Sequence, residues 1–447
     1  MAENIEGGKH VTMDLSRRII SYGDGVLDAA TLTVAKQCIL DWFAVTLAGF
    51  NEPVARLLRE EIVGNSRGQA TIIGSAAKCA PTDAALVNGA TSHALDYDDV
   101  HPLVGHPTVA ILPAVLAVAE AENASGEKVL RAFIAGYEAA AFVGSLVMPS
   151  HYDRGFHSTA TLGSFGAAAA AGLLLDLDEE QMAMALGLAG TQAAGLKSMF
   201  GTMAKPFHAG KAAANGVLAA RLAKRGFTAH PGVLEVPQGF VTTQSDCETL
   251  PDGDFQPRSG RVVDTLFKFH AACYLTHSTI EAVSTICRDQ SLLPHDIESI
   301  DIHVAPGHLK VCNIPSPRTG LEMKFSLAHV AALAATGIDT AAIESYSDEN
   351  ATDPALMTIR DRITVHGDRS PGTGADILVK MQSGESFTDQ IDVGIPDRDI
   401  NRQGKRLLRK FRSLTEPVIG IERAERLQLQ INTLESAANI HRMTTIE

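Results

Sequence analysis

From residue 12 to residue 225 apolar side chains recur at helical spacing, and alternation of period two is almost absent. An apolar stripe that returns every three to four residues is the pattern of a helix with one buried face. Only residues 71–74 look like a short extended piece. The sequence therefore predicts a large helical domain, with helices at about 12–50 (one or two), 53–64, 81–93, 107–124, 126–147, 157–176, 179–195 and 207–225.

The pattern changes near residue 262, where alternating stretches begin. They predict strands at 299–305, 363–366, 375–381 and 386–393, with a hairpin turn at Ser383-Gly384. Helices at 276–290 and 325–336 lie between them, and the chain is helical again from about 399. The predicted fold is mainly α. It has a helical domain from residues 1–265 and 399–447, on which the tail packs back, and a smaller α+β domain at 266–398.

Length and charge narrow the classes of function. The 447 residues exceed the roughly 250–300 at which a single core stops growing, which also favours two domains. A net charge of −14 disfavours nucleic acid and anionic membranes as partners, and an anionic substrate would need a local cationic pocket. The first nine residues contain no apolar signal core, and the six cysteines show no C-x-x-C spacing. We expect a cytoplasmic protein with reduced thiols.

The stretch 93–106 holds an unusual density of titratable groups between apolar helices. Charged groups between buried segments cost several kcal/mol unless they are paired. The residues alone leave two interpretations equally weighted, a functional site or a set of helix caps and ion pairs. The groups are His93, Asp96, Asp98, Asp99, His101 and His106.

Three further segments carry candidate side chains. His157 follows Gly155-Phe156, and Lys205, His208 and Lys211 lie near the start of a predicted helix, whose N–H groups favour an anion. A capped surface helix explains that second segment equally well. The third segment carries Lys268, His270, Cys273 and His277. The alternative without a function is that His277 is a hydrogen-bonded histidine of the core and Cys273 is a buried thiol.

The sequence lacks the motifs that are typical of most metal-binding and cofactor-binding sites. Asp96-Tyr-Asp98-Asp99 matches neither an EF-hand loop nor H-E-x-x-H, and no P-loop, strand-linked G-x-G-x-x-G or G-x-S-x-G is present. We expect no metal and no other cofactor. What remains is acid–base chemistry, with Asp and His moving a proton while Lys205, Lys211, Lys268 and Arg318 hold carboxylates. That combination suits proton abstraction beside a carboxylate, where cations stabilise the developing charge.

Five segments in order resemble the signature of the MmgE/PrpD family, from about residue 15 to 440. They are His93-Ala-Leu-Asp-Tyr-Asp-Asp99 with His106-Pro107, Gly155 to Thr161, Lys205 to Gly216, Lys268 with Cys273-Tyr274 and His277, and Lys324-Phe-Ser326 after Pro317-Arg318-Thr319. The resemblance implies a helical domain built from both chain ends, an inserted α+β lid domain, homodimers and no metal. Family members include 2-methylcitrate dehydratase, cis-aconitate decarboxylase and iminodisuccinate epimerase, which all make or quench a carbanion beside a carboxylate.

By this resemblance the catalytic positions are Asp96, His106, Lys205, Lys268 and His277. Substrate contacts are expected from Lys205, Lys268, His157, His208, Lys211, Arg318 and Cys273. Val100, Cys273 and His329 depart from residues common in cis-aconitate decarboxylases, which weighs against decarboxylation. The sequence therefore predicts a cofactor-free dehydratase acting on a small di- or tricarboxylate such as 2-methylcitrate. The alternatives are an epimerase of the iminodisuccinate type, a decarboxylase, and a non-catalytic helical scaffold.

His106 is the first choice for the proton-transfer residue, because an unperturbed imidazole titrates near 6.5 and needs the least adjustment. Asp96 would orient it or balance its charge. The catalytic set spans segments far apart in the sequence, so we expect these segments to meet in a cleft between the helical domain and the lid.

Overall fold

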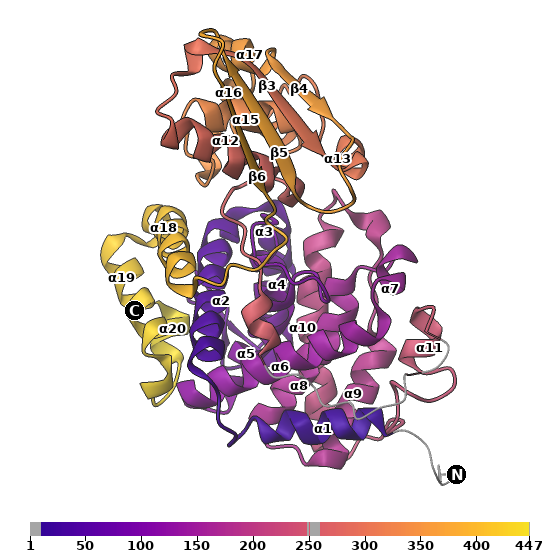
Figure 1. Ribbon diagram of the computed structural model, residues 1–447. Helices are drawn as coiled ribbons and strands as arrows, with labels where there is room; N and C mark the ends of the chain where they lie inside the picture. The colour runs from indigo at the N-terminus through magenta and orange to yellow at the C-terminus, as the bar shows by residue number, and fades with distance from the viewer. Residues whose placement is uncertain (1–9, 248–249, 251–259, 447) are drawn as a thin grey trace. The chain divides into compact units, whose positions relative to one another are not determined.

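The computed structural model describes residues 10–247, 250 and 260–446. The first nine residues, for which the sequence predicts no signal segment, lie outside this range. The chain divides into two compact units. Unit 1 comprises Met1–Thr265 and Ile400–Glu447, and unit 2 comprises Leu266–Asp399 (Figure 1). Both ends of the chain therefore belong to one unit, and the other is formed by the segment between them.

Unit 1 is helical, and its long helices follow the predicted ones closely. They are α1 (Val11–Ser21), α2 (Ala29–Ala48), α3 (Pro53–Ile62), α4 (Pro81–Ser92), α5 (Pro107–Ala121), α6 (Gly126–Val147), α8 (Ser158–Leu174), α9 (Glu179–Gln192) and α10 (Ala204–Lys224). The short helices α7 (Ser150–Asp153) and α11 (Phe240–Gln244) were not predicted. The C-terminal segment adds α18 (Ile400–Ile419), α19 (Ile421–Asn432) and α20 (His441–Thr445). The extended piece is a two-residue ladder of β1 (Ala70–Thr71) with β2 (Lys78–Cys79).

The core of unit 1 is built around α8, which packs against α5, α6, α9 and α10. Small residues make this possible, because a Cβ added at Gly136 of α6 would come 2.5 Å from the carbonyl oxygen of Gly166 in α8. Among the described residues α6 is the one helix long and apolar enough to cross a membrane, and 83% of its apolar window is buried inside the protein. Burial of that extent is typical of a core helix.

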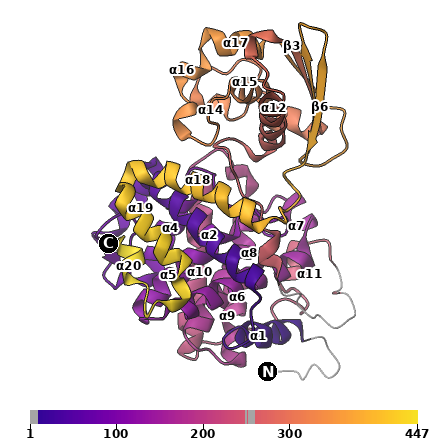
Figure 2. The same cartoon turned by 60° about the vertical axis from the view of Figure 1, so that its left-hand side comes forward.

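The C-terminal helix α18 lies along α2, the two ribbons running side by side in Figure 2. Their contact includes buried polar groups, since Gln403 of α18 donates to Gln37 of α2 at 2.8 Å. Segments at opposite ends of the sequence thus form one wall of unit 1.

Unit 2 contains a four-stranded sheet in the order β4-β3-β5-β6. The strands are β3 (Ile297–Val304), β4 (Ile363–His366), β5 (Ala375–Met381) and β6 (Ser386–Ile391). β3 runs parallel to β4 and antiparallel to β5, and the β5–β6 turn places Gly384 at φ 90. The helices are α12 (His277–Asp289), α13 (Pro306–Val311), α14 (Gly320–Met323), α15 (Leu327–Ala335), α16 (Asp348–Ala351) and α17 (Pro354–Arg360).

The fold is mainly helical with one small sheet, as predicted, but two local predictions are wrong. Lys205 lies in the first turn of α10, which begins at Ala204, and not in a loop that ends at Pro206. Proline needs no N–H partner there, so the helix can start before it. Among the described residues the six cysteines form no disulfide, as expected, but Cys273 is half-buried and not buried.

Candidate active site

The loop between α4 and α5 carries the cluster, and two residues in left-handed conformations shape it. Asp96 has φ 50 and Gly105 has φ 88. His101 and Gly105 exchange backbone hydrogen bonds of 2.7 and 2.9 Å, and the next amide, of His106, donates to Thr159 Oγ1 at 3.0 Å. A Cβ at Gly105 would come 2.7 Å from that same Thr159 oxygen, so a glycine is required here. The start of α8 therefore fixes the backbone of His106.

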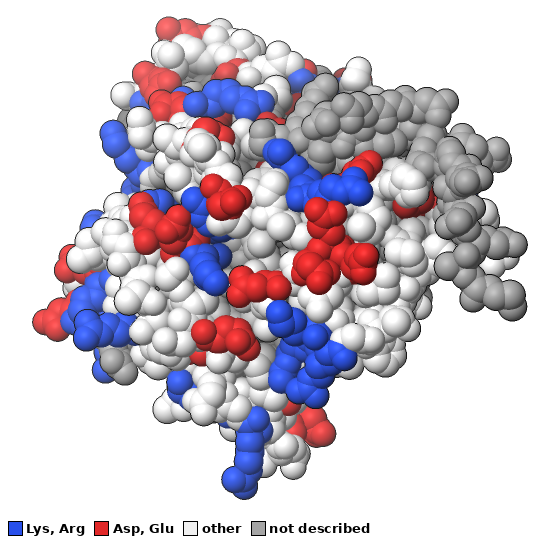
Figure 3. Space-filling model, turned by 90° about the horizontal axis from the view of Figure 1, so that it is seen from below, with Lys and Arg blue, Asp and Glu red and all other residues white. Residues whose placement is uncertain are grey.

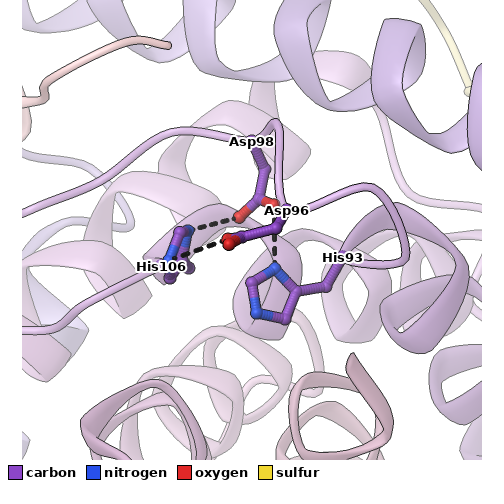
Figure 4. Close-up of side chains that lie close together, drawn as sticks. All are labelled: His93, Asp96, Asp98 and His106. Carbon is purple, nitrogen blue, oxygen red and sulfur yellow. Dashed lines mark hydrogen bonds and ion pairs between the residues drawn. The ribbon is translucent and has the colours of Figure 1, made fainter. Parts of the chain in front are cut away.

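Asp98 lies between two imidazoles and binds both of them (Figure 4). Its carboxylate oxygens are 2.8 Å from Nδ1 of His93 and 2.8 Å from Nδ1 of His106, and the residue is 1% exposed. Burial raises the pKa of Asp98, but the two imidazoles outweigh burial and hold the pKa well below its usual range. The ionised Asp98 forms a hydrogen bond with Nδ1–H of His93, which leaves Nε2 of that ring free of a proton. Its other oxygen lies at ion-pair distance from Nδ1 of His106, and this contact favours a proton on that nitrogen as well.

Asp96 connects the same histidine to a lysine. Its Oδ1 lies 2.7 Å from Nζ of Lys205 in α10 and 3.5 Å from Nε2 of His106. The Asp96 side chain is 44% exposed and that of His106 is 14% exposed, whereas His93 is fully buried. Burial lowers the pKa of His93 to about 4, which keeps that ring neutral. His106 is therefore the imidazole of this pair that a substrate can reach.

A second imidazole pair adjoins the first. His157 and His208 share one hydrogen bond, Nδ1 to Nδ1 at 3.0 Å, and His157 stacks at 6.2 Å on His93. Only one of these two nitrogens can carry the shared proton, so one ring is protonated at Nδ1 and the other ring is not. Burial, with His93 and Lys205 nearby, holds the pKa of His157 well below its usual range. His157 is thus a neutral ring.

Unit 2 holds the remaining candidates. Lys268 is 1% and His277 2% exposed, and the His277 ring meets His270 edge-on at 5.0 Å. Burial, then His270 and Lys268, lower the pKa of His277 well below its usual value. Arg318 is exposed.

The predicted site residues thus divide between the two units. In unit 1 the structure brings together Asp96, His106 and Lys205, with His157 and His208 beside them, and Lys211 is exposed further along α10. Lys268, Cys273, His277 and Arg318 belong to unit 2. Their convergence with the first set stays a prediction.

The spacing of four groups would allow a metal ion. One ligand atom from each of His93, Asp96, Asp98 and His106 lies within 4.8 Å of all the others. However, each Asp98 oxygen already faces an imidazole nitrogen at 2.8 Å, and the Lys205 ammonium lies 2.7 Å from Asp96, where a cation would bind. A divalent ion would have to break both sets of contacts, so these donors fit proton transfer better.

Two members of the cluster received no role from the sequence, His93 and Asp98. Both stand in the titratable loop, and His93 ends α4 five residues before the carboxylate that it binds. The short separation between His93 and Asp98 in the sequence could therefore have indicated that the two side chains pair. Which of the loop's three carboxylates faces which ring depends on the turn at Asp96.

Fold and cluster together describe a mainly helical protein in which imidazole, carboxylate and ammonium groups lie in contact. The chain belongs to the MmgE/PrpD family. Residues 18–250 match the MmgE/PrpD N-terminal domain, and residues 270–436 match the C-terminal domain. The curated relatives are lyases by name, so the family assignment supports an enzyme of lyase type.

These relatives are similar over nearly their whole length. The cis-aconitate decarboxylase-like protein oryM of Aspergillus oryzae is 27% identical over 98% of this chain and 97% of its own length. Cis-aconitate decarboxylase of Aspergillus terreus is 27% identical over 91% of this chain and 89% of its own. The Homo sapiens protein of that name is 26% identical over 98% of this chain and 94% of its own.

Proposed function

We propose that the protein is a metal-independent lyase that acts on a small di- or tricarboxylate through a carbanion beside a carboxylate. One observation carries the proposal. His106 is held through Nδ1 at 2.8 Å by the buried Asp98, while its Nε2 faces the pair of Asp96 with Lys205. A base with a fixed tautomer thus stands beside a cation that can bind an anionic group.

The proposed dehydration begins when Nε2 of His106 removes a proton from the carbon next to a substrate carboxylate. The electron pair of that C–H bond moves into the carboxylate, and the Lys205 ammonium stabilises the added charge. Asp98 stabilises the imidazolium that forms. The electrons then return to form the C=C bond as the C–O bond on the neighbouring carbon breaks, and the hydroxyl group takes the proton from His106 and leaves as water.

The first candidate substrate is 2-methylcitrate or a similar citrate, as the sequence predicts. A second candidate, decarboxylation of cis-aconitate, is favoured by the names of the relatives. In that reaction the bond to a carboxylate breaks, CO₂ leaves with neither proton nor added electrons, and His106 as imidazolium protonates the carbanion. The same side chains serve both reactions, because each passes through the same kind of carbanion.

Substrate charge is the common requirement. Although the chain is acidic overall, the face drawn in Figure 3 carries basic and acidic side chains interspersed. Within the cluster the cation is Lys205, whose side chain is 15% exposed. We propose that a substrate carboxylate takes the place of Asp96 on this ammonium. Lys268, His277 and Arg318 remain proposed contacts from unit 2.

The test is a product analysis with 2-methylcitrate, citrate, cis-aconitate and iminodisuccinate. Dehydration gives new ultraviolet absorbance from the C=C bond without CO₂. Decarboxylation releases CO₂, and epimerisation changes optical rotation while absorbance and CO₂ stay constant. The His106→Gln variant, which lacks the proposed base, serves as the matched inactive control. Failure to turn over any di- or tricarboxylate would favour the non-catalytic scaffold.

A further inference from the structure

The loop between α4 and α5 is also held by a buried lysine of the C-terminal segment, in α18. Lys410 of α18 donates from Nζ to the carbonyl oxygen of Tyr97 at 2.6 Å. The same ammonium lies 2.6 Å from Oδ1 of Asp41 in α2 and 4.0 Å from the centre of the Tyr97 ring. The side chains of Lys410 and Asp41 are each 2% exposed. All these residues belong to unit 1.

The carbonyl that Lys410 binds occupies a particular place in the loop. It belongs to the peptide that joins Tyr97 to Asp98, and Asp96 precedes it in a left-handed conformation at φ 50. Asp96 and Asp98 are the two carboxylates that contact His106, at 3.5 and 2.8 Å. Lys410 therefore binds the backbone between the two groups that surround the proposed base.

A different anchor holds the next residue. Asp99 accepts a hydrogen bond from Thr108 Oγ1 of α5 at 2.5 Å. Asp96 is bound by α10 through Lys205, and Asp98 by His93 at the end of α4. The segment 96–99 is thus fixed by four helices, and the contact from α18 acts on a backbone carbonyl of the segment.

Stability alone is a weak explanation for this ion pair. Two buried charges lose their hydration, and well-packed apolar residues of similar volume are often as stable or more so. The cost is visible at Asp41, where burial raises the pKa to about 6 although Lys410 opposes the rise. A pair of apolar residues would lack the N–H group that donates a hydrogen bond to the Tyr97 carbonyl.

We propose that Lys410 is a positioning residue of the active site, which sets the placement of Asp96 and Asp98 around His106 through the Tyr97 carbonyl. The inference rests on the proposed function in that it assigns a further residue to the same site. In this role Lys410 acts through the loop backbone and not on the substrate. Its effect is therefore expected on turnover more than on substrate binding.

Two variants that both lose the ion pair separate positioning from stability. Asp41→Asn removes the charge partner but keeps the Lys410 donor, whereas Asp41→Asn with Lys410→Met removes both. We expect near wild-type kcat for Asp41→Asn. For the double variant we expect kcat lowered by about 10²-fold with KM within about 3-fold, because a shift of about 1 Å in a catalytic group can cost that much. Lys405→Met, an exposed lysine on the same helix, is the control and should change neither.

A second readout does not depend on which substrate is turned over. Nitrogen-15 NMR of the histidine side chains reports the Nδ1 atoms of His93 and His106, each 2.8 Å from an Asp98 oxygen, and the signals are assigned with His106→Gln. We expect the chemical shifts of these signals to change in the double variant and in Lys410→Met, and to stay at their wild-type values in Asp41→Asn.

Wild-type kcat and unmoved imidazole signals in a folded double variant would overturn the proposal. So would an equal loss of kcat in Asp41→Asn, since a purely structural ion pair predicts equal losses. If the wild-type protein turns over no carboxylate, the proposed function fails while the NMR comparison still decides the role of Lys410. If the double variant does not fold, the same signals in Asp41→Asn decide it. Unmoved signals there support a donor that acts without its ion partner, and displaced signals contradict it.

Discussion

Asp98 is the residue on which the state of the proposed base depends, since it binds Nδ1 of His106 at 2.8 Å and is almost fully buried. Asp98→Asn replaces an acceptor by a group that also donates, so one of the two imidazoles must change tautomer. We expect kcat to fall by about 10²-fold or more with a smaller change in KM. Steady-state kinetics measure this, with circular dichroism to show that the fold is kept. Unchanged kcat would mean that the tautomer of His106 is set elsewhere.

Lys205 is expected to act on substrate binding, because its ammonium pairs with Asp96 at 2.7 Å and can exchange that partner for a substrate carboxylate. Lys205→Met should raise KM by about 10-fold or more, the loss expected for a charged hydrogen bond, with a smaller effect on kcat. Lys224→Met is the matched control, an exposed lysine at the other end of α10. A loss confined to kcat would instead place the interaction in the transition state alone.

The sequence predicts several members of the site for a physical reason that the structure makes plain. Titratable groups between apolar helices must be paired, so their density in 93–106 marks a cluster. The role of Asp98 could not be read from the sequence. It depends on the left-handed turn at Asp96 and on the approach of α8 to Gly105, and neither is a property of spacing.

At the scale of elements, the crossing of α4 and α10 places Lys205 next to the loop. The helices approach so closely that a Cβ on Gly89 would come 2.7 Å from the Cα of Gly210. Gly210→Ala should therefore push the helices apart and lower the free energy of unfolding by about 1–3 kcal/mol. It should also reduce activity, because Lys205 is five residues away on the same helix.

Urea unfolding and kinetics of Gly210→Ala test this, with Gly64→Ala as control, since an added Cβ there meets nothing within 4 Å. Equal stability and activity in the two variants would show that the crossing tolerates a methyl group and does not position Lys205.

Long helices with a continuous apolar stripe were predictable, and so were the alternating strands of unit 2. The short helices α13, α14, α16 and α17 were not predicted, because four to seven residues are too few to show a period. Three of them, α14, α16 and α17, begin with a single side-chain cap. For example, Ser347 accepts from the N–H of Asn350, and Asp353 accepts from that of Leu356. The parallel pairing of β3 with β4 could not be predicted from the sequence either. Alternation of apolar and polar residues shows which face of a strand is buried, but not the direction in which the strand runs.

At the scale of the whole molecule, stability should depend on pH through buried groups outside the cluster. Burial raises the pKa of Glu138 to about 7 from an ordinary 4.5, although Val262 N–H donates to it and Arg261 and Arg18 lie nearby. Between about pH 5 and 7 the folded protein then holds a proton that the unfolded chain has lost. This contribution to stability therefore declines as pH rises through that window.

Glu138→Gln should remove this decline. Relative to the wild type, its free energy of unfolding should be higher at pH 8 than at pH 5 by about 1–3 kcal/mol, as a shift of this size implies. Urea unfolding at the two pH values measures the difference. A constant difference between the proteins would contradict the raised pKa.

The homodimer and the cytoplasmic location remain predictions at this scale, as does the meeting of Lys268 and His277 with the unit 1 cluster. The homodimer and the meeting of these residues depend on surfaces that come together, and not on the pattern within one segment. The family, by contrast, follows from five segments in order and is confirmed by both domain matches.

The central claim is metal-independent proton transfer at a carbon beside a carboxylate, and hydrogen exchange with heavy water tests it most directly. The chelator-treated protein is incubated with di- and tricarboxylates in D₂O, and deuterium uptake at that carbon is followed by NMR. We predict exchange that persists in EDTA and falls by about 10²–10⁴-fold in His106→Gln. Exchange that needs added Mg²⁺ or Zn²⁺, that His106→Gln retains at the wild-type rate, or that no substrate shows would contradict the claim.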